Sequence, residues 1–163
     1  VLGLPQPITE ERKYIVKVTG EIPSSIDSHI MQTYLVSDPD SEVRLRQREW
    51  ANGNVVNVHT TTKTLKANQQ VETERQVSNA LYESLLSQAD PYRQTICKQR
   101  KSFIWKGQYF ELDTYEKQLE GLVILETKGI TDKEHVNFPP FIEEVEDITG
   151  NQKYYNYNLA LRH

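Results

Sequence analysis

The stretch VRLRQREW, residues 43–50, alternates strictly between non-basic and basic side chains over its first six residues. Successive side chains of a β-strand point to opposite sides, so the two aliphatic residues face one way and Arg44, Arg46 and Arg48 face the other. The aliphatic side predicts a strand that packs on a core. The arginine side requires either water or a polyanion. A solvated outer face explains one such strand taken alone, so the decision rests on the remaining strands.

Composition limits the classes of function. The chain has 163 residues, enough for one domain with a hydrophobic core. Its formal net charge of -4 argues against a non-specific nucleic-acid binder, so a polyanion site must come from local sorting of charges. The single Cys97 excludes an internal disulfide framework, and no apolar run is long enough to cross a bilayer. We expect a cytoplasmic protein, with peripheral attachment to membranes as the alternative.

Most of the chain has the pattern of strands. Alternation and β-branched residues predict eight strands, at 13–18, 28–36, 43–50, 55–65, 71–77, 93–105, 108–116 and 119–129. The turn Lys106-Gly107-Gln108 joins the sixth and seventh into a hairpin. Residues 78–89 change to helical spacing, with Ser78 as N-cap and Leu81, Leu85 and Leu86 on one side. The tail predicts a second, short helix.

These elements predict a mainly β (α+β) fold, an eight-stranded antiparallel β-barrel or tunnel with a few peripheral helices. We expect residues 1–163 to form one domain, with residues 1–9 as a linker from an upstream domain. Nearly every strand gathers charges of both signs on one face, and a wet, charged lumen would accommodate them. The basic members of these faces are Lys13, Arg44, Arg46, Arg48, Lys63, Lys98 and Arg100, and the acidic members are Glu11, Glu72, Glu74, Glu111, Asp113 and Glu126.

Seven motifs in order along the chain resemble those of the CYTH domain, the fold of the triphosphate tunnel metalloenzymes. They are TEERK at residues 9–13, VRLRQR, TTTK, VETER, CKQRKSF, FELD and GLVILE. The opening GLPQPITEERK is similar to proteins in which a P-loop nucleotide-binding domain precedes the CYTH domain. An insect member of that group binds GTP and phospholipid and serves the trafficking of a channel, so the resemblance implies a nucleoside triphosphate, polyphosphate or phosphoinositide ligand.

The resemblance assigns roles to the charged residues. The basic set listed above would bind phosphates, because guanidinium groups can grip phosphate oxygens in pairs. Glu11, Glu74, Asp113 and Glu126, with Glu72 and Glu111 nearby, would hold Mg²⁺ or Mn²⁺. Two carboxylates of the family pattern are missing, because Thr9 and Ile124 stand in their places. Glu10 is out of phase and cannot replace the first of them.

Three functions stay open at this point. The departures at Thr9 and Ile124 favour a polyanion-binding module with little hydrolysis, part of a trafficking or signalling protein. The alternative is a metal-dependent triphosphatase that hydrolyses tripolyphosphate or nucleotides. A barrel with only a structural or protein-interaction role is the third.

The remaining candidates have structural interpretations. His29, His59, His135 and His163 lack the spacing of metal ligands, and Cys97 lies on the face opposite Lys98. Trp50 and Trp105 are expected in the core or at the mouth of the tunnel, and Thr149 in a structural role. We expect the basic residues, with Glu11, to converge on one interior cavity.

Overall fold

The computed structural model describes residues 5–7, 11–66, 69–130 and 133–162, and these form two compact units. Unit 1 comprises Val1–Ile8, Ile30–Ile96 and Asn156–His163, and unit 2 comprises Thr9–His29 and Cys97–Tyr155. Thr9, Glu10 and His163 lie outside the described residues. Among the described helices, none has the length and apolar character needed to cross a membrane.

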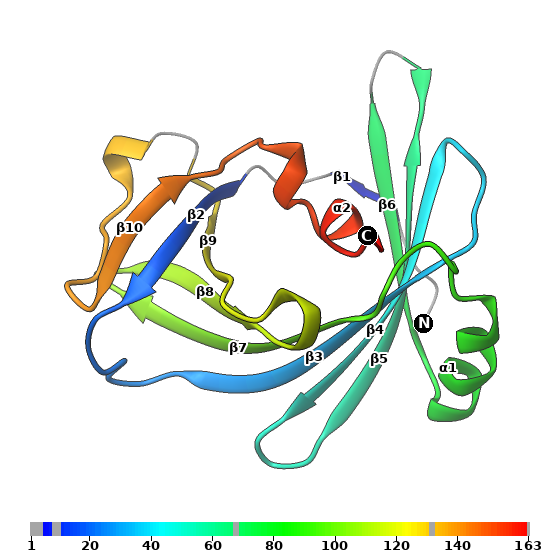
Figure 1. The fold of residues 1–163 in the computed structure, drawn as a ribbon, viewed down its shortest axis with the longest axis horizontal. Helices are drawn as coiled ribbons and strands as arrows, with labels where there is room; N and C mark the ends of the chain where they lie inside the picture. Colours follow the sequence, from blue (N-terminus) through cyan, green and yellow to red (C-terminus); the bar gives the residue numbers. More distant parts are fainter. Residues whose placement is uncertain (1–4, 8–10, 67–68, 131–132, 163) are drawn as a thin grey trace. The chain divides into compact units, whose positions relative to one another are not determined.

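Strands dominate both units (Figure 1). The strands are β1 (Pro5–Pro7), β2 (Glu11–Val18), β3 (Ile26–Leu35), β4 (Ser41–Trp50), β5 (Val55–Thr64), β6 (Gln70–Val77), β7 (Ile96–Trp105), β8 (Gln108–Tyr115), β9 (Val123–Lys128) and β10 (Ile142–Asp147). The helices are α1 (Asn79–Leu85) and α2 (Asn156–Leu159), with short 3₁₀ turns at Leu86–Gln88, Lys117–Leu119, Lys133–His135 and Gln152–Tyr154. The printed strand pairs are antiparallel. The prediction of a mainly β, antiparallel fold with few helices is confirmed.

The described residues contain ten strands where the sequence predicted eight. β1 replaces part of the expected opening loop and pairs with β6. β10 pairs with β2 only, with an irregularity between Glu144 and Glu146. An edge strand has one neighbouring strand, and charged residues and bulges commonly protect it from pairing with other chains. The edge strand β10 has the acidic sequence IEEVED, which therefore lacks a clear alternation. Closure of the strands into a barrel stays a prediction.

Unit 1 has the strand order β1-β6-β5-β4-β3, with α1 on one face of the sheet. Leu45 and Val77 of the sheet pack with Tyr82 of α1 in a small apolar cluster. Ser78 caps the helix as predicted, since its hydroxyl accepts a hydrogen bond from the Leu81 amide at 3.1 Å. The predicted packing face of α1 was wrong in one position, because Tyr82 is buried and Leu81 is exposed.

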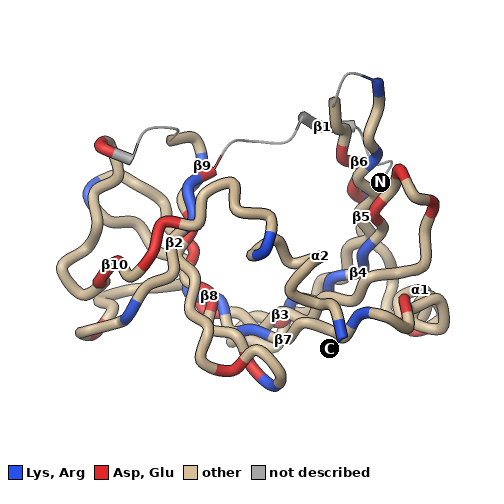
Figure 2. Tube along the Cα trace, turned by 45° about the horizontal axis from the view of Figure 1, so that its top comes forward, with Lys and Arg blue, Asp and Glu red and all other residues tan. Residues whose placement is uncertain are grey.

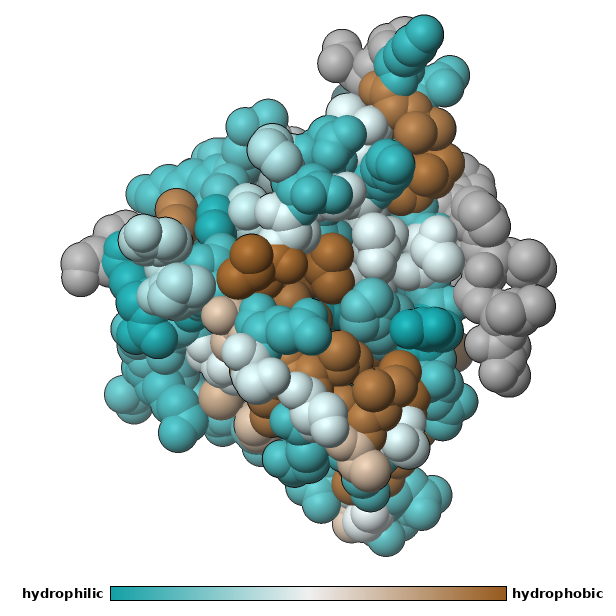
Figure 3. All heavy atoms as spheres, turned by 90° about the vertical axis from the view of Figure 1, so that its right-hand side faces the viewer, coloured by the Kyte–Doolittle hydropathy of each residue, from teal (hydrophilic) through white to brown (hydrophobic). Residues whose placement is uncertain are grey.

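Apolar side chains also reach the surface of unit 1. Figure 3 shows apolar patches between hydrophilic side chains on the side where β4, β5, β6 and α1 lie. The exposed members in this unit include Val36, Val55, Leu65 and Leu81. The C-terminal helix α2 is held to the same unit through Arg93, whose guanidinium lies 3.4 Å from the centre of the Tyr157 ring.

Unit 2 has the strand order β7-β8-β9-β2-β10. The β7–β8 hairpin closes with Lys106 and Gly107, both at positive φ, as the two-residue turn of a hairpin requires. One face of this sheet carries the main apolar core, which consists of Tyr14, Val16, Phe103, Phe110, Leu112, Leu125, Val136, Phe141 and Ile142. Strand alternation then forces the residues between them onto the other face.

Candidate functional site

The other face of unit 2 carries charges from four adjacent strands, and we call it the charged face. Strand register places Arg100 opposite Asp113, Glu111 opposite Glu126, and Glu126 opposite Lys13. Figure 2 shows acidic and basic residues following one another along β8, β9 and β2. The charged face consists of Glu11, Lys13, Lys98, Arg100, Glu111, Asp113, Glu126 and Lys128. The prediction that these charges from separate strands share a face is confirmed within this unit.

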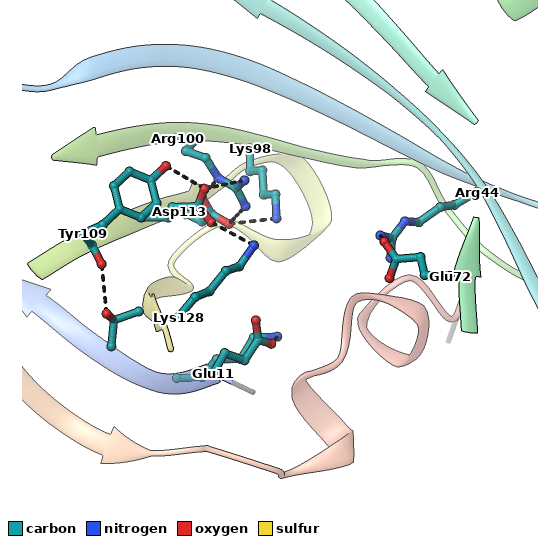
Figure 4. Close-up of polar contacts among 11 residues, drawn as sticks. Glu11, Arg44, Glu72, Lys98, Arg100, Tyr109, Asp113 and Lys128 are labelled. Atoms are coloured by element: carbon teal, nitrogen blue, oxygen red, sulfur yellow. Dashed lines mark hydrogen bonds and ion pairs between the residues drawn. The ribbon is translucent and has the colours of Figure 1, made fainter. Parts of the chain in front are cut away.

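A buried ion triad lies at one end of the charged face (Figure 4). Arg100 donates from Nε to Asp113 Oδ1 at 2.8 Å and from Nη2 to Oδ2 at 2.9 Å, and Lys98 Nζ lies 2.8 Å from the same Oδ2. Burial by itself raises the pKa of Asp113, but the charges and hydrogen bonds of Lys98 and Arg100 outweigh it and hold the pKa far below the usual range. Asp113 is therefore ionised, and both its oxygens are engaged.

Glu111 has one oxygen held and one without a hydrogen bond. Its Oε2 accepts a hydrogen bond from the Tyr109 hydroxyl at 2.9 Å and lies 3.3 Å from Arg100 Nη1. Its Oε1 is buried and finds no hydrogen-bond partner among the described residues, with Lys128 Nζ at 4.0 Å. A buried carboxylate oxygen in this state is available to a cation or a ligand.

Glu126 and Glu11 form a carboxyl pair on the neighbouring strands. Burial, followed by the hydrogen bond and charge of Glu11, raises the pKa of Glu126 to about 7. Lys13 lies beside the pair, with Nζ 3.7 Å from Glu11 Oε1. Two adjacent carboxyls avoid full ionisation by holding a proton, and a bound cation can replace that proton.

Ile124, which the sequence resemblance predicts to stand in place of a carboxylate, lies on the charged face. It lies directly opposite Asp113 on β8 and Ile15 on β2, and its side chain is buried. That Ile124 replaces a metal-binding carboxylate stays a prediction. Thr9, the other departure, lies outside the described residues.

Unit 1 carries a second charged surface, which we call the arginine face. Register places Arg44, Arg46 and Arg48 of β4 opposite Thr60, Val58 and Val56 of β5. The same face carries Glu42 on β4 and Glu72 and Glu74 on β6, of which Glu74 is exposed. Each of the three arginines is half-buried.

The acids lie at the Arg44 end of the arginine face. Arg44 lies 3.8 Å from Glu72 and 4.0 Å from Glu42, measured between the nearest guanidinium nitrogen and carboxylate oxygen (Figure 4). Burial raises the pKa of Glu42 despite the opposing charges of Arg44 and Arg93. At the other end, the guanidinium of Arg48 lies 4.7 Å from the centre of the Trp50 ring.

The structure does not bring Lys63 together with the arginines. Lys63 lies opposite Ser41 and Val71, so it shares the other face of the sheet with Val43 and is exposed. The run TTTKT has no apolar alternation, so its phase could not be determined from the sequence. The prediction that Lys63 lies on the same face as the arginines was wrong.

Sequence reasoning missed several charged-face and arginine-face residues. Glu42, Tyr109 and Lys128 contact predicted site residues through ion pairs or hydrogen bonds. The alternation of side chains along a strand could have identified all three. Each lies two residues from a predicted site residue and therefore on the same face.

The remaining candidates have structural environments. His29 pairs with Glu116 at 2.8 Å, and burial raises the pKa of Cys97. Trp105 packs edge-on against Phe141, and Thr149 accepts a hydrogen bond from the Lys13 amide. Across the described ranges, no group of three or more His, Cys, Asp or Glu side chains is arranged to hold a metal ion.

The chemistry of the charged face nevertheless suits a divalent cation. Mg²⁺ and Mn²⁺ prefer carboxylate oxygens, and Glu11, Glu111 and Glu126 are adjacent across β2, β9 and β8. The buried Glu111 oxygen without a hydrogen bond and the raised pKa of Glu126 both fit a place for positive charge. Asp113 fits less well, because Lys98 and Arg100 already occupy its oxygens.

Comparison with solved structures gives the fold. Two crystal structures of NE1496, one described as an inorganic triphosphatase, share 26% and 25% sequence identity with the chain, each at a TM-score of 0.67. The matches cover 95% and 97% of this chain and 99% and 97% of theirs. The hypothetical protein Pfu-838710-001 from Pyrococcus furiosus shares 16% identity at a TM-score of 0.50, over 77% of this chain and 81% of its own.

No protein-family model and no curated protein matches the sequence. The structural similarities establish a mainly β, CYTH-like fold, as the ordered motifs of the sequence indicated.

Proposed function

We propose that the protein binds a triphosphate and hydrolyses it with the help of a divalent metal ion. The observation that carries the proposal is the charged face of unit 2, where three carboxylates, Glu11, Glu111 and Glu126, lie beside the buried Lys98–Asp113–Arg100 triad. The similarity to an inorganic triphosphatase along 97% of both chains supports the same reading.

The residues of the charged face would have separate roles in metal binding and phosphate binding. Glu11, Glu111 and Glu126 would hold Mg²⁺ or Mn²⁺, which neutralises phosphate charge and lowers the pKa of bound water. Tyr109 orients Glu111 by donating to its Oε2. Lys13, Lys98 and Arg100 supply positive charge for phosphate oxygens, and the buried triad keeps Arg100 fixed in place.

The arginine face of unit 1 is, by itself, a second candidate surface for phosphate groups. Arg44, Arg46 and Arg48 repeat at every second residue of one strand, which spaces them about 6.6 Å apart, close enough to meet successive phosphates. Arg44 is shared with Glu72 and Glu42 at 3.8 and 4.0 Å, distances that leave it able to move to a more negative partner.

A metal-dependent assay tests hydrolysis. The purified protein is incubated with tripolyphosphate, ATP or GTP, with Mg²⁺ or Mn²⁺ and with chelator, and released phosphate is measured. We expect release that requires metal and falls at least about a hundredfold in Glu111→Gln and Glu126→Gln, since each loses a charged metal ligand. Glu143→Gln, on the exposed edge strand β10, is the matched control and should keep wild-type release. Absence of release under every condition contradicts hydrolysis.

Binding without hydrolysis is the second candidate function, and Ile124 favours it. An apolar, buried side chain stands opposite Asp113 where the family pattern has a metal-ligating carboxylate. A domain of this kind would bind triphosphate with its cations and release little phosphate. GTP or a phosphoinositide head group as the ligand, a trafficking role, a P-loop domain upstream and a cytoplasmic location stay predictions from the sequence resemblance.

A further inference from the structure

The segment that follows β10, residues 148–155, lies beside Lys13 of β2 (Figure 1). The Ile148 amide donates to the Lys13 carbonyl at 3.0 Å. The Lys13 amide donates to the Thr149 hydroxyl oxygen at 3.0 Å, and that hydroxyl donates to the Lys13 carbonyl at 3.3 Å. Both backbone polar groups of Lys13 are therefore engaged by this segment, which fixes the point from which the lysine side chain leaves the strand.

Thr149 is itself held by Asp147, the last residue of β10. The Thr149 amide donates to Asp147 Oδ1 at 3.0 Å, and Arg12 Nη2 donates to Asp147 Oδ2 at 2.6 Å. Arg12 directly precedes Lys13, and successive side chains of a strand point to opposite sides. The end of β10 and the segment after it therefore hold two successive residues of β2, one through its side chain and the other through its backbone.

Tyr155 ends this segment, and its ring lies against the Lys13 ammonium. Lys13 Nζ is 5.6 Å from the centre of the Tyr155 ring, within the range of a cation–π contact. The Tyr155 amide donates to the Gln152 carbonyl at 3.2 Å, which fixes the turn that carries the ring. Tyr155 is 42% exposed, whereas the Lys13 side chain is 12% exposed. The ring thus covers a charged group of the site while it keeps much of its own surface in solvent.

The Lys13 ammonium is only loosely paired with Glu11. Its Nζ lies 3.7 Å from Glu11 Oε1, whereas a direct charge-assisted hydrogen bond between such groups is about 2.7–2.9 Å long. Strand register places a second acid, Glu126, directly opposite Lys13. An ammonium that moved closer to either acid would neutralise a carboxylate of the proposed metal site. It would also have fewer N–H donors left for phosphate oxygens.

We infer that Tyr155 is a positioning residue of the phosphate site, and that its ring holds the Lys13 ammonium in this open position. The π face attracts the ammonium without neutralising it, so the positive charge stays available to an anionic ligand. The backbone contacts of Ile148 and Thr149 hold the rest of the lysine. The inference rests on the proposed triphosphate-binding function and adds to it a residue that no motif of the sequence identified.

A double-mutant cycle tests the coupling between the ring and the ammonium. Tripolyphosphate binding is measured by calorimetry, at fixed salt and with chelator, for the wild type, Tyr155→Leu, Lys13→Met and the double variant. Loss of the ring should weaken binding about threefold to tenfold, and loss of the ammonium about tenfold to a hundredfold. In the Lys13→Met background, Tyr155→Leu should change affinity less than about twofold, because no ammonium is left to position.

Two further variants serve as controls. Tyr155→Phe keeps the ring and should bind tripolyphosphate within about twofold of the wild type. Tyr154→Leu removes the adjacent ring, which lies 5.4 Å from Lys153 Nζ, and should also keep wild-type affinity. The thermal unfolding midpoint of every variant shows whether a loss of binding comes from a loss of folding.

Nuclear magnetic resonance of the wild type gives a second measurement that does not depend on Tyr155→Leu folding. The Lys13 side-chain methylene signals, assigned by their absence from Lys13→Met, should be displaced upfield by the ring current of Tyr155. Tripolyphosphate should move them more than the signals of Lys101, which pairs with Asp27 at 2.8 Å. Lys13 signals without a ring-current displacement, or unmoved by tripolyphosphate, overturn the inference.

The outcomes separate this inference from the proposed function. Unchanged or tighter binding in Tyr155→Leu overturns the inference. An equal effect of Tyr155→Leu with and without Lys13 also overturns it, because the ring would then act on the fold or on the ligand itself. In both cases metal-dependent phosphate release by the wild type leaves the proposed function standing. Intact coupling without release contradicts hydrolysis alone, and failure of the wild type to bind tripolyphosphate, with or without Mg²⁺, overturns both.

Discussion

Ile124 lies directly opposite Asp113 in the β8–β9 pair, so a buried apolar side chain is the neighbour of an ion-paired carboxylate on the charged face. Arg100 and Lys98 occupy both oxygens of that carboxylate. Both oxygens of Asp113 are therefore engaged, and we propose that Glu11, Glu111 and Glu126 hold the cation instead. The predictions below follow from this division.

A carboxylate at position 124 should make the stability of the protein depend on a divalent metal ion. Ile124→Glu places a charge in a buried position, so we expect loss of stability without metal and recovery with Mn²⁺. The thermal unfolding midpoint is measured with and without Mn²⁺, and phosphate release is followed in parallel. Ile124→Gln, which has the same size without the charge, should show no such recovery. An equal response of both variants to Mn²⁺ contradicts the assignment.

The Lys98–Asp113–Arg100 triad should contribute strongly to stability. Asp113→Asn leaves two buried cations without their counter-charge, and breaking a buried pair typically costs about 3–5 kcal/mol. The free energy of unfolding is obtained from urea titration. Asp27→Asn is the control, because its partner Lys101 and Asp27 itself are more than two-fifths exposed and such pairs contribute about 1 kcal/mol or less. Similar losses in the two variants would argue against a structural role for the triad.

Glu126 should make stability fall as pH rises. Its pKa is about 7 in the folded protein against an ordinary value of 4.5, so the folded state holds a proton that the unfolded state has lost. The stabilising contribution is complete below pH 4.5 and is lost as pH rises through about 7. The unfolding free energy is measured from pH 4.5 to 8 for the wild type and Glu126→Gln. The variant should lack this part of the slope, and parallel curves would contradict the raised pKa.

The two faces of β4 and β5 offer a direct test of phosphate binding. Arg44→Ala combined with Arg46→Ala removes two charge-assisted contacts, each worth roughly 1.5–3 kcal/mol, so tripolyphosphate affinity should fall a hundredfold or more. Lys63→Ala removes a cation from the opposite face and should leave affinity unchanged. Affinity is measured by calorimetry at fixed salt. A larger effect of Lys63→Ala than of the arginine pair would place the anion site elsewhere.

The contrast between Arg44 and Lys63 also shows where sequence reasoning succeeds. In VRLRQREW the aliphatic residues fix the phase, so the common face of the three arginines could be predicted. In TTTKT every residue is polar, and only the pairing of Lys63 with Ser41 reveals its side of the sheet. Alternation likewise located Ile124 and the charged-face acids, because Leu112 and Leu125 mark the core side of β8 and β9.

Other features depend on contacts that no local pattern carries. β10 is an acidic edge strand with an irregular register, so its sequence lacks the alternation of a half-buried strand. The engagement of Asp113 by two cations and the raised pKa of Glu126 both depend on which strands are neighbours in the sheet. The spacing of residues in the sequence identifies these candidates, but it does not show which of their carboxylates are already ion-paired.

A crystal structure with Mn²⁺ and tripolyphosphate tests the central claim most directly. The anomalous signal of Mn²⁺ identifies the metal without reference to any assumed ligand. We expect the peak beside Glu11, Glu111 and Glu126, with phosphate oxygens contacting Lys98 and Arg100. A metal or triphosphate bound only at other residues, or absent from all three carboxylates at saturating concentration, would contradict the account.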